Sequence, residues 1–256
     1  MPLTQAQRKR LVDLARGRGE AGLHLLEGAK SVRDALPSGV VRELYLAESL
    51  DPAVAAALEA AAAAARVPVQ RAAGADLERA SDTVSPQGVL AVVADTAEPL
   101  ERLLARPGLL AWLDGVQDPG NVGAVVRVAA AFGVAGLLVG AGSADPLGLK
   151  ALRASAGLAL RMPFARAPGE AIARALTAGR RPVWLLENGG RDLFAVEQVP
   201  AGLVLVVGSE GAGPSAPARA AATGSVGIPI RPEVESLNAA VATGLVVGVL
   251  SRRAPR

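Results

Sequence analysis

The amino-acid sequence predicts an α/β fold, with a mostly parallel sheet and helices on both faces, preceded by a small α/β domain. The first observation is a set of continuous apolar runs at Leu109–Leu113, Gly136–Gly140 and Gly202–Val207. The second is that helical segments separate these runs, for example residues 122–132 and 169–178. Strands that are apolar throughout and alternate with helices are typical of a parallel sheet covered on both faces.

The same alternation extends to the end of the chain. Further strands are predicted over Pro182–Leu186 and Val226–Ile230, and further helices over Leu147–Ala154 and from Leu237 onward. Ligands of such sheets bind at the loops beyond the carboxyl ends of the strands. We therefore expect the functional residues in those loops.

The first 95 residues follow a different pattern. Strands are predicted over residues 23–27, 40–46 and 88–94, with a helix over 29–36. An alanine-rich helix begins after Asp51 and Pro52, a helix cap followed by proline in the first helical position. Mixed charge and two prolines follow the third strand. The predicted division is a domain over residues 1–97, a linker over 98–107 and a second domain over 108–256.

Composition narrows the class of protein. The 256 residues include no cysteine, so disulfides and thiolate metal sites are excluded, and a cytoplasmic location is expected. No strongly apolar run has the length of a membrane span, and the first ten residues lack the apolar core of a signal peptide. The net charge of +3 is compatible with a polyanionic partner, but it can equally reflect a requirement for solubility. The predominance of arginine over lysine suits phosphate contacts, and a coding bias explains it equally well.

One motif is discounted. Gly17–Gly22 matches the G-x-G-x-x-G pattern of dinucleotide-binding sites. It follows a basic, helix-like segment rather than a strand, and no βαβ unit surrounds it, whereas the pattern is informative only in that context. A nicotinamide-dependent oxidoreductase is therefore disfavoured, and a flexible loop is predicted.

Three other segments carry unusual residues after predicted strands. In the first, over residues 113–127, Asn121 lies near a helix start and Arg127 almost two turns later. Asn121 is then either a helix cap or a functional side chain. Arg127 is either a solvated helix residue or one that faces a cleft.

The second segment, Val206–Pro214, is a strand running into a glycine-rich loop. Glycines allow a backbone to approach a ligand closely, although a plain turn has the same composition. No lysine follows, which disfavours a nucleoside triphosphate.

The third segment, Ile228–Ala242, leaves a strand through a proline-stiffened loop and enters a helix. Ser236 in this position is commonly a helix cap. Asn238 in the first turn is harder to explain, because asparagine is a poor residue for a helix interior.

Together the three segments resemble the SpoU (TrmH) family of RNA ribose 2′-O-methyltransferases. The resemblance covers residues 109–253 and rests on three co-occurring motifs, and residues 20–94 also look like the substrate-binding domain of many members. The motif residues are Asn121, Gly123 and Arg127; Gly208, Glu210 and Gly211; and Ile228, Pro229, Ser236, Leu237 and Asn238.

The resemblance implies a fold, a cofactor and an assembly. The C-terminal segment is expected to form a trefoil knot, the first domain to be ribosomal-protein-like, and the chain to be a homodimer. S-adenosylmethionine is the implied cofactor, held mostly by backbone groups. A side chain at Gly208 is expected to collide with it, so Gly208→Val should abolish cofactor binding while the fold stays soluble. The implied cofactor-binding residues are Gly208, Ile228, Leu237, Glu187, Gly189, Ile230 and Ala242.

The resemblance also implies an activity, the methylation of a ribose 2′-hydroxyl in structured RNA, ribosomal RNA being favoured over transfer RNA. Arg127 is expected to hold the substrate phosphate and stabilise the attacking oxygen, since a guanidinium does not deprotonate in proteins. Asn121, Ser236 and Asn238 would orient the ribose and phosphate, and Glu210 would brace Arg127 or the glycine loop. Neither a metal nor a membrane is implied. The alternative is a catalytically silent RNA-binding protein that retains the fold.

Overall fold

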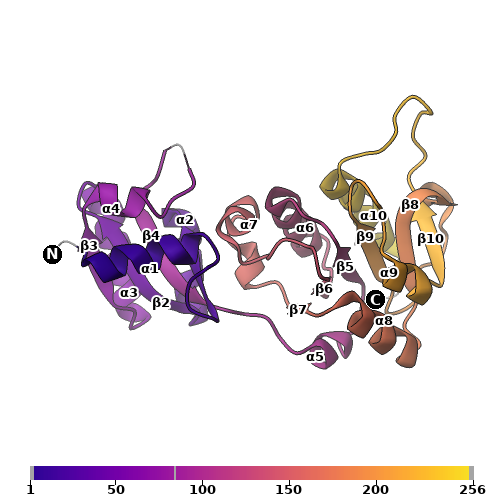
Figure 1. Ribbon diagram of the computed structural model, residues 1–256, viewed down its shortest axis with the longest axis horizontal. Helices are drawn as coiled ribbons and strands as arrows, with labels where there is room; N and C mark the ends of the chain where they lie inside the picture. Colours follow the sequence, from indigo (N-terminus) through magenta and orange to yellow (C-terminus); the bar gives the residue numbers. More distant parts are fainter. Residues whose placement is uncertain (1–2, 84, 254–256) are drawn as a thin grey trace. The chain divides into compact units, whose positions relative to one another are not determined.

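The computed structural model describes residues 3–83 and 85–253, which divide into two compact units (Figure 1). The first unit comprises Met1–Thr96 and Leu147–Arg161, and the second comprises Ala97–Pro146 and Met162–Arg256. Leu147–Arg161, which the sequence analysis placed in the second domain, thus clusters with the first unit. The segment predicted as a linker lies in the second unit and includes a short helix.

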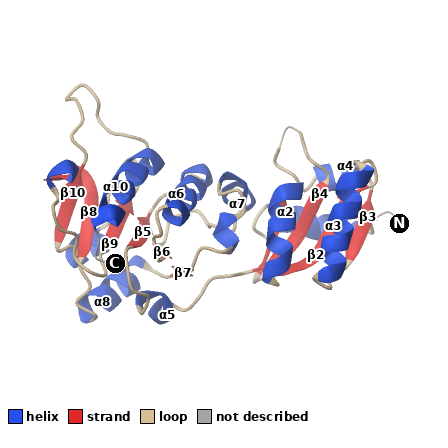
Figure 2. Ribbon diagram, turned by 180° about the vertical axis from the view of Figure 1, so that it is seen from behind, coloured by secondary structure: helices blue, strands red, loops and turns tan. Residues whose placement is uncertain are grey.

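The first unit is a four-stranded mixed sheet with helices on both faces. Its strand order is β1-β4-β2-β3, with β4 antiparallel to both of its neighbours and β2 parallel to β3. Figure 1 shows α1 across one face of this sheet, and Figure 2, from behind, shows α2 and α3 on the other. The elements are α1 (Gln5–Ala15), β1 (Leu23–Glu27), α2 (Ala29–Ala35), a 3-10 helix (Leu36–Ser38), β2 (Val41–Ala47), α3 (Pro52–Ala64), β3 (Val69–Ala72), α4 (Gly74–Glu78), β4 (Val89–Ala94), α7 (Leu149–Ala154) and a second 3-10 helix (Leu158–Leu160).

The second unit contains a six-stranded sheet in which every pair of neighbouring strands is parallel. The order is β10-β8-β9-β5-β6-β7, so the mostly parallel sheet predicted from the apolar runs is confirmed. The elements are α5 (Leu100–Leu104), β5 (Leu110–Asp114), α6 (Pro119–Ala131), β6 (Gly136–Val139), β7 (Phe164–Arg166), α8 (Gly169–Ala178), β8 (Val183–Asp192), a 3-10 helix (Leu193–Ala195), β9 (Val204–Gly208), α9 (Ala216–Ala221), β10 (Gly224–Gly227) and α10 (Ala239–Arg253).

The core of the second unit fixes the sheet between its helices. Trp112 and Phe164 are fully buried, and Leu103 of α5, Ile172 of α8 and Ala218 of α9 pack in one cluster with Trp112 and other strand residues. Helices α6 and α10 pack against each other, and α10 also contacts β9. Within the described ranges, no helix is both long and apolar enough to span a bilayer.

Helix starts follow local chemistry. The predicted cap of α3 is confirmed: Asp51 Oδ1 accepts hydrogen bonds from the backbone N–H groups of Ala53 and Val54 at 2.9 and 3.1 Å, with Pro52 in the first helical position. Such caps satisfy N–H groups that have no partner inside the helix.

Strand β10 begins and ends earlier than predicted. It spans Gly224–Gly227, and Ile228–Ile230 belongs to the following loop, where Pro229 has no N–H to donate to a neighbouring strand. A Cβ on Gly227 would lie 2.8 Å from the Glu187 carbonyl oxygen, and one on Gly190 would lie 2.6 Å from the Val226 backbone. The two glycines therefore allow β8 and β10 to approach where their register shifts, between Ser225 and Val226.

Tyr45 provides a test of the core of the first unit. Its ring is buried in the cluster formed with α1 and β4, and its hydroxyl donates to Glu43 Oε2 at 2.5 Å. Burial, and secondly the Glu43 carboxylate, raises the pKa of Tyr45 to about 12. Since the folded pKa lies above the unfolded value of about 10, this contribution to stability is complete below pH ~10 and is lost as the pH rises toward 12.

Because Tyr45 is the single tyrosine of the sequence, tyrosinate absorbance reports it alone. We expect a titration midpoint near 12 in the folded chain and near 10 in denaturant, with Tyr45→Phe removing the signal. A folded-state midpoint near 10 would show that the hydroxyl is not held as described.

Candidate active site

A cavity of about 200 Å³ lies at the carboxyl edge of the parallel sheet. Strand β8, the loops that leave β9 and β10, and the first turn of α10 contribute most of its lining. All of the predicted cofactor-binding residues except Gly189 line this cavity. Two of the predicted catalytic residues, Glu210 and Ser236, line it as well. The six lining residues predicted for the cofactor are Gly208, Ile228, Leu237, Glu187, Ile230 and Ala242.

Asn121 joins the three motif segments. Its Oδ1 accepts a hydrogen bond from Asn238 Nδ2 at 2.9 Å, and its Nδ2 donates to Glu210 Oε1. Asn238 lies 117 residues and Glu210 89 residues away along the chain. The fold therefore brings together the residues that the sequence motifs singled out.

The caps of the two helices at the site are Asp118 and Asn238. Asp118 Oδ1 accepts from the Asn121 N–H at 2.9 Å at the start of α6. At the start of α10, Asn238 Oδ1 accepts from the N–H groups of Ala240 and Val241 at 3.0 and 3.2 Å. The helix thus begins at Ala239 rather than Leu237. Asn238 is a cap and not an interior residue, while Asn121 and Ser236, for which capping was considered, do not cap.

Arg127 lies on α6, two turns after the helix start, with an exposed side chain. It does not line the cavity, and it makes no hydrogen bond or ion pair with any residue in 3–83 or 85–253. Glu210 bonds to Asn121 rather than to Arg127. The guanidinium therefore has all its donors available and makes no polar contact that would support the fold.

The glycine-rich loop is held by its own backbone. A Cβ on Gly208 would lie 2.4 Å from the carbonyl carbon of Gly213 and from the nitrogen of Pro214. The structure thus shows a collision within the loop, which the sequence-based expectation for Gly208 did not include. Real Cβ atoms essentially never approach other atoms this closely, so the Gly208 position depends on glycine before any ligand is considered.

A buried carboxylate fixes the far end of this loop. Asp114, at the end of β5, is 5% exposed and stands opposite Gly208 in the sheet register. Its two oxygens accept hydrogen bonds from the Ser215 N–H at 2.6 Å and the Ser215 hydroxyl at 3.0 Å. Charge-assisted bonds of this kind are stronger than neutral ones, so they fix the loop against the sheet.

The β8 side of the cavity contains two more polar links. Arg219 Nη1 donates to Glu187 Oε2 at 2.8 Å, and Asn188 Nδ2 donates to the Glu235 carbonyl at 2.8 Å. Gly189 is exposed, with a φ of 78° that favours glycine. The cavity-lining residues that were not predicted from the sequence include Ser209, Pro214, Arg219 and Ala239. Ser209 and Pro214 stand inside the glycine-rich motif, whereas Arg219, one of many arginines, gave no sequence signal.

The donor set of the cavity favours an organic ligand. Its walls combine apolar residues, such as Leu186, Ile228 and Leu237, with a few polar ones, such as Ser209 and Ser236. Pockets of this kind bind small organic molecules and orient them with few polar groups. In the described part of the chain, no three His, Asp or Glu side chains gather closely enough to hold a metal ion.

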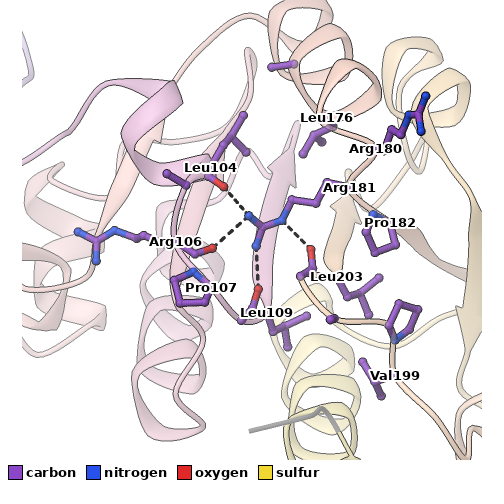
Figure 3. Close-up of a pocket in the computed structure, with 17 residues that line it drawn as sticks. Leu104, Arg106, Pro107, Leu109, Leu176, Arg180, Arg181, Pro182, Val199 and Leu203 are labelled. Carbon is purple, nitrogen blue, oxygen red and sulfur yellow. Dashed lines mark hydrogen bonds between the residues drawn. The ribbon is translucent and has the colours of Figure 1, made fainter.

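A larger cavity, of about 830 Å³, lies at the opposite, amino edge of the sheet, where Leu109, Pro182 and Leu203 precede β5, β8 and β9. Figure 3 shows Arg181 at its centre. The guanidinium donates to the carbonyl oxygens of Gly202, Leu104, Arg106 and Gly108, at 2.6, 2.6, 3.1 and 2.7 Å. Arg181 thus ties three loops together, and no predicted site residue lines this cavity.

Comparison with known proteins identifies the family. The model of the SpoU rRNA methylase family matches residues 108–248. The chain belongs to this family. A second model, described as RNA 2′-O ribose methyltransferase substrate binding, matches residues 25–99. The first span contains all three site motifs, and the second contains most of the first unit.

Solved SpoU-family structures resemble the whole chain. An AdoMet-bound rRNA methyltransferase from Sinorhizobium meliloti superimposes with a TM-score of 0.85 at 28% identity, over 99% of this chain and 96% of that one. The SpoU methyltransferase AviRb from Streptomyces viridochromogenes, in complex with AdoMet, gives 0.83 at 27% identity, over 97% and 98%. The fold of the chain is therefore that of SpoU methyltransferases.

Curated relatives have related names. A tRNA/rRNA methyltransferase of uncharacterised function from Mycobacterium bovis is 38% identical over 71% of this chain and 59% of its own length. The chain thus spans less than two thirds of that relative. A 23S rRNA (adenosine(1067)-2′-O)-methyltransferase from Streptomyces laurentii is 40% identical over 58% of this chain and 55% of its own length.

The glycine loop generates a testable difference between two positions. Gly208→Ala should destabilise the fold by about 1–3 kcal/mol, the usual range for an overpacked site. Gly211→Ala is the matched control, because a Cβ there would meet nothing within 4 Å, and it should change stability by less than about 0.5 kcal/mol. Denaturant unfolding of both variants measures this. Equal stability of the two would contradict the close approach at Gly208.

Proposed function

We propose that this chain transfers a methyl group from S-adenosylmethionine to a ribose 2′-hydroxyl of structured RNA. The observation that carries the proposal is the Asn238–Asn121–Glu210 hydrogen-bond network beside the loop cavity. The AdoMet complexes of the neighbours from S. meliloti and S. viridochromogenes support the cofactor. The name of the S. laurentii relative supports ribosomal RNA over transfer RNA.

The residues of the cavity fit this cofactor. Backbone groups at Gly208, Ile228 and Leu237 would hold it, and Ile230 and Ala242 would form apolar walls. On the β8 side, Glu187 lines the cavity, and Gly189 lies outside the lining. The bound cofactor supplies an electrophilic methyl group. Failure of S-adenosylmethionine to bind in a calorimetric titration would favour the alternative, a catalytically silent RNA-binding protein.

The remaining polar groups would position the nucleophile. A 2′-hydroxyl is a weak acid, so its attack requires alignment and stabilisation of the developing negative charge. Asn121, Asn238 and Ser236 would orient the ribose and phosphate, and Glu210 braces Asn121. His24, the single histidine, lies in the first unit 3.3 Å from Asp95, so it is not the base in this proposal.

Arg127 would hold the substrate phosphate through its planar fork and stabilise the attacking oxygen. Arg127→Lys keeps the charge but loses the bidentate geometry. We expect single-turnover methyl transfer to saturating RNA to fall by about 10²–10³-fold, as for loss of one preorganised donor.

Because Arg127 has no partner among the described residues, its replacement should leave the melting temperature unchanged. Arg174→Lys, at another exposed arginine on α8, is the matched control and should retain full activity. Near-normal transfer by a folded Arg127→Lys protein would remove Arg127 from the catalytic residues.

The proposal includes a homodimer formed through α10 and the end of α6. Val241 and Leu245 of α10 and Phe132 after α6 are 55%, 44% and 43% exposed. A Cβ on Gly248 of α10 would lie 3.3 Å from the Phe132 ring, so the apolar face is continuous. This apolar face begins one turn after Asn238, and Phe132 extends it to the end of α6, the helix that carries Arg127. A second copy of the chain would bury the face and complete the site.

Leu245→Glu should therefore yield a folded monomer with little methyl transfer. Sedimentation velocity measures the mass, and the melting temperature of the monomer reports its fold. Val54→Glu, at an exposed apolar residue of the first unit (37% exposed), should remain dimeric. A wild-type chain that sediments as a monomer at micromolar concentration would contradict the dimer.

Two architectural features belong to the same proposal. The loop over residues 228–238 and helix α10 would form the trefoil knot, and residues 1–97 would be an RNA substrate-binding domain joined by residues 98–107 to the catalytic domain. The match of the substrate-binding family model to residues 25–99 supports the second of these. A cytoplasmic location stays a prediction.

A further inference from the structure

The first unit has a polar cavity of its own. It has a volume of about 180 Å³ and lies where β1 ends and α2 begins. Residues from the segment before β4 and from α7 complete its wall. The lining includes Glu27, Lys30, Ser31, Thr83, Gln87 and Arg153.

Glu27 places an unpartnered acceptor in this cavity. Its side chain is 5% exposed, and its Oε1 accepts from the Ser81 hydroxyl at 2.6 Å and the Thr83 hydroxyl at 3.2 Å. Its Oε2 is buried and has no hydrogen bond to any described residue. Leaving a buried charged oxygen without a donor is costly, so a polar cavity containing one is suited to a ligand that supplies an N–H or O–H.

Arg153 forms a long ion pair with Oε2 but no hydrogen bond. Its Nη1 lies 3.9 Å away, beyond hydrogen-bond distance, and the guanidinium donates to Asp82 instead. The side chains of Arg153 and Asp82 are 37% and 42% exposed. Exposed ion pairs hold side chains weakly, so Arg153 can turn outward and open the carboxylate.

Charge identifies the kind of ligand. Two cations, Lys30 and Arg153, line the cavity. Lys30 Nζ pairs with Asp34 Oδ2 at 2.8 Å, and Arg33 and Arg161 lie close enough to the same carboxylate to help lower its pKa. Such cations attract phosphates. The Glu27 carboxylate repels a phosphate inside the cavity and accepts N–H groups there. A nucleotide of RNA has both parts, a phosphate for the cations and a base with N–H donors for the interior.

Gln87 narrows the choice of base. Its Oε1 accepts from the Ala29 N–H at 3.2 Å, which directs the amide NH₂ away from that contact, and the NH₂ has no partner among the described residues. The cavity therefore combines an acceptor, Glu27 Oε2, with a donor, Gln87 Nε2. Both lone pairs of Oε2 are free, so this oxygen can accept two N–H groups. Guanine presents adjacent imino and amino N–H groups next to a carbonyl oxygen, whereas uracil presents one N–H beside its carbonyl and adenine has no carbonyl.

We propose that this cavity receives one unpaired guanine of the RNA, with its N–H groups on Glu27 and its carbonyl on Gln87. Unpaired bases splayed out of an RNA are recognised in this way, by hydrogen bonds to their edges. The inference rests on the proposed RNA-binding function and deepens it, since it assigns base recognition to the first unit.

Fluorescence anisotropy with the full chain tests it. The probes are a ten-nucleotide oligouridine and the same strand with one central guanosine or one central N1-methylguanosine. The guanosine strand should bind about tenfold or more tightly than the other two, as expected for a well-formed bidentate contact. Glu27→Gln replaces the free acceptor by a donor yet keeps an oxygen for Ser81 and Thr83. It should abolish the preference while affinity for oligouridine stays the same.

The matched control is Glu48→Gln, an exposed carboxylate of the first unit, which should keep the preference. Gln87→Glu reverses the second contact at an exposed residue, so it tests the inference even if Glu27→Gln unfolds, and it should also remove the preference. Equal binding of the three strands by the wild type, or a preference that survives in folded Glu27→Gln or Gln87→Glu protein, overturns the guanine cavity. Absence of binding to any strand at low salt overturns the RNA-binding function together with it.

Discussion

The candidate active site depends on one side chain that is shared by three loops. Asn121 accepts from Asn238 and donates to Glu210, so the first turn of α6, the cap of α10 and the glycine-rich loop are coupled. A primary amide can do this because it has a donor and an acceptor on the same rigid plane. Aspartate would lose the donor and leucine both groups. The spacing of the motifs in the sequence thus reflects a single junction in space.

This junction is possible because the sheet is parallel throughout. Every strand ends at the same edge, so loops from distant parts of the sequence meet without long connections. Two constraints then set the position of the glycine-rich loop. Gly208 allows the backbone of Gly213 and Pro214 to lie against it, and Asp114 binds Ser215 at the far end. With both ends fixed, the N–H and C=O groups between them are preorganised for a ligand.

The sequence predicted those features that depend on local chemistry. Continuous apolar strands, the Asp51 cap and the residues of the three motifs all carry signals within a few positions of each other.

Features that depend on tertiary contacts could not be predicted from the sequence. Asn238 caps α10 and also donates to Asn121, 117 residues away, and this second contact has no local signal in the sequence. The pair Gly190 and Gly227 appears unremarkable in sequence, and its role follows from the register shift between β8 and β10. The grouping of Leu147–Arg161 with the first unit likewise follows from packing, since Leu149 joins the core cluster of that unit.

Two arginines of the second unit have opposite surroundings. The guanidinium of Arg181 donates to four carbonyl oxygens at the amino edge of the sheet. Burial lowers its pKa from the usual value, so the charge is kept at a cost that these acceptors offset. Arg127 is exposed on α6 and, within the described chain, binds no acceptor at all. The guanidinium of Arg127 therefore makes no polar contribution to the fold. Its planar fork suits a phosphate group, which the chain itself does not contain. The four acceptors around Arg181 therefore identify it as a structural arginine, whereas the fork of Arg127 stays available for an acceptor from outside the described chain.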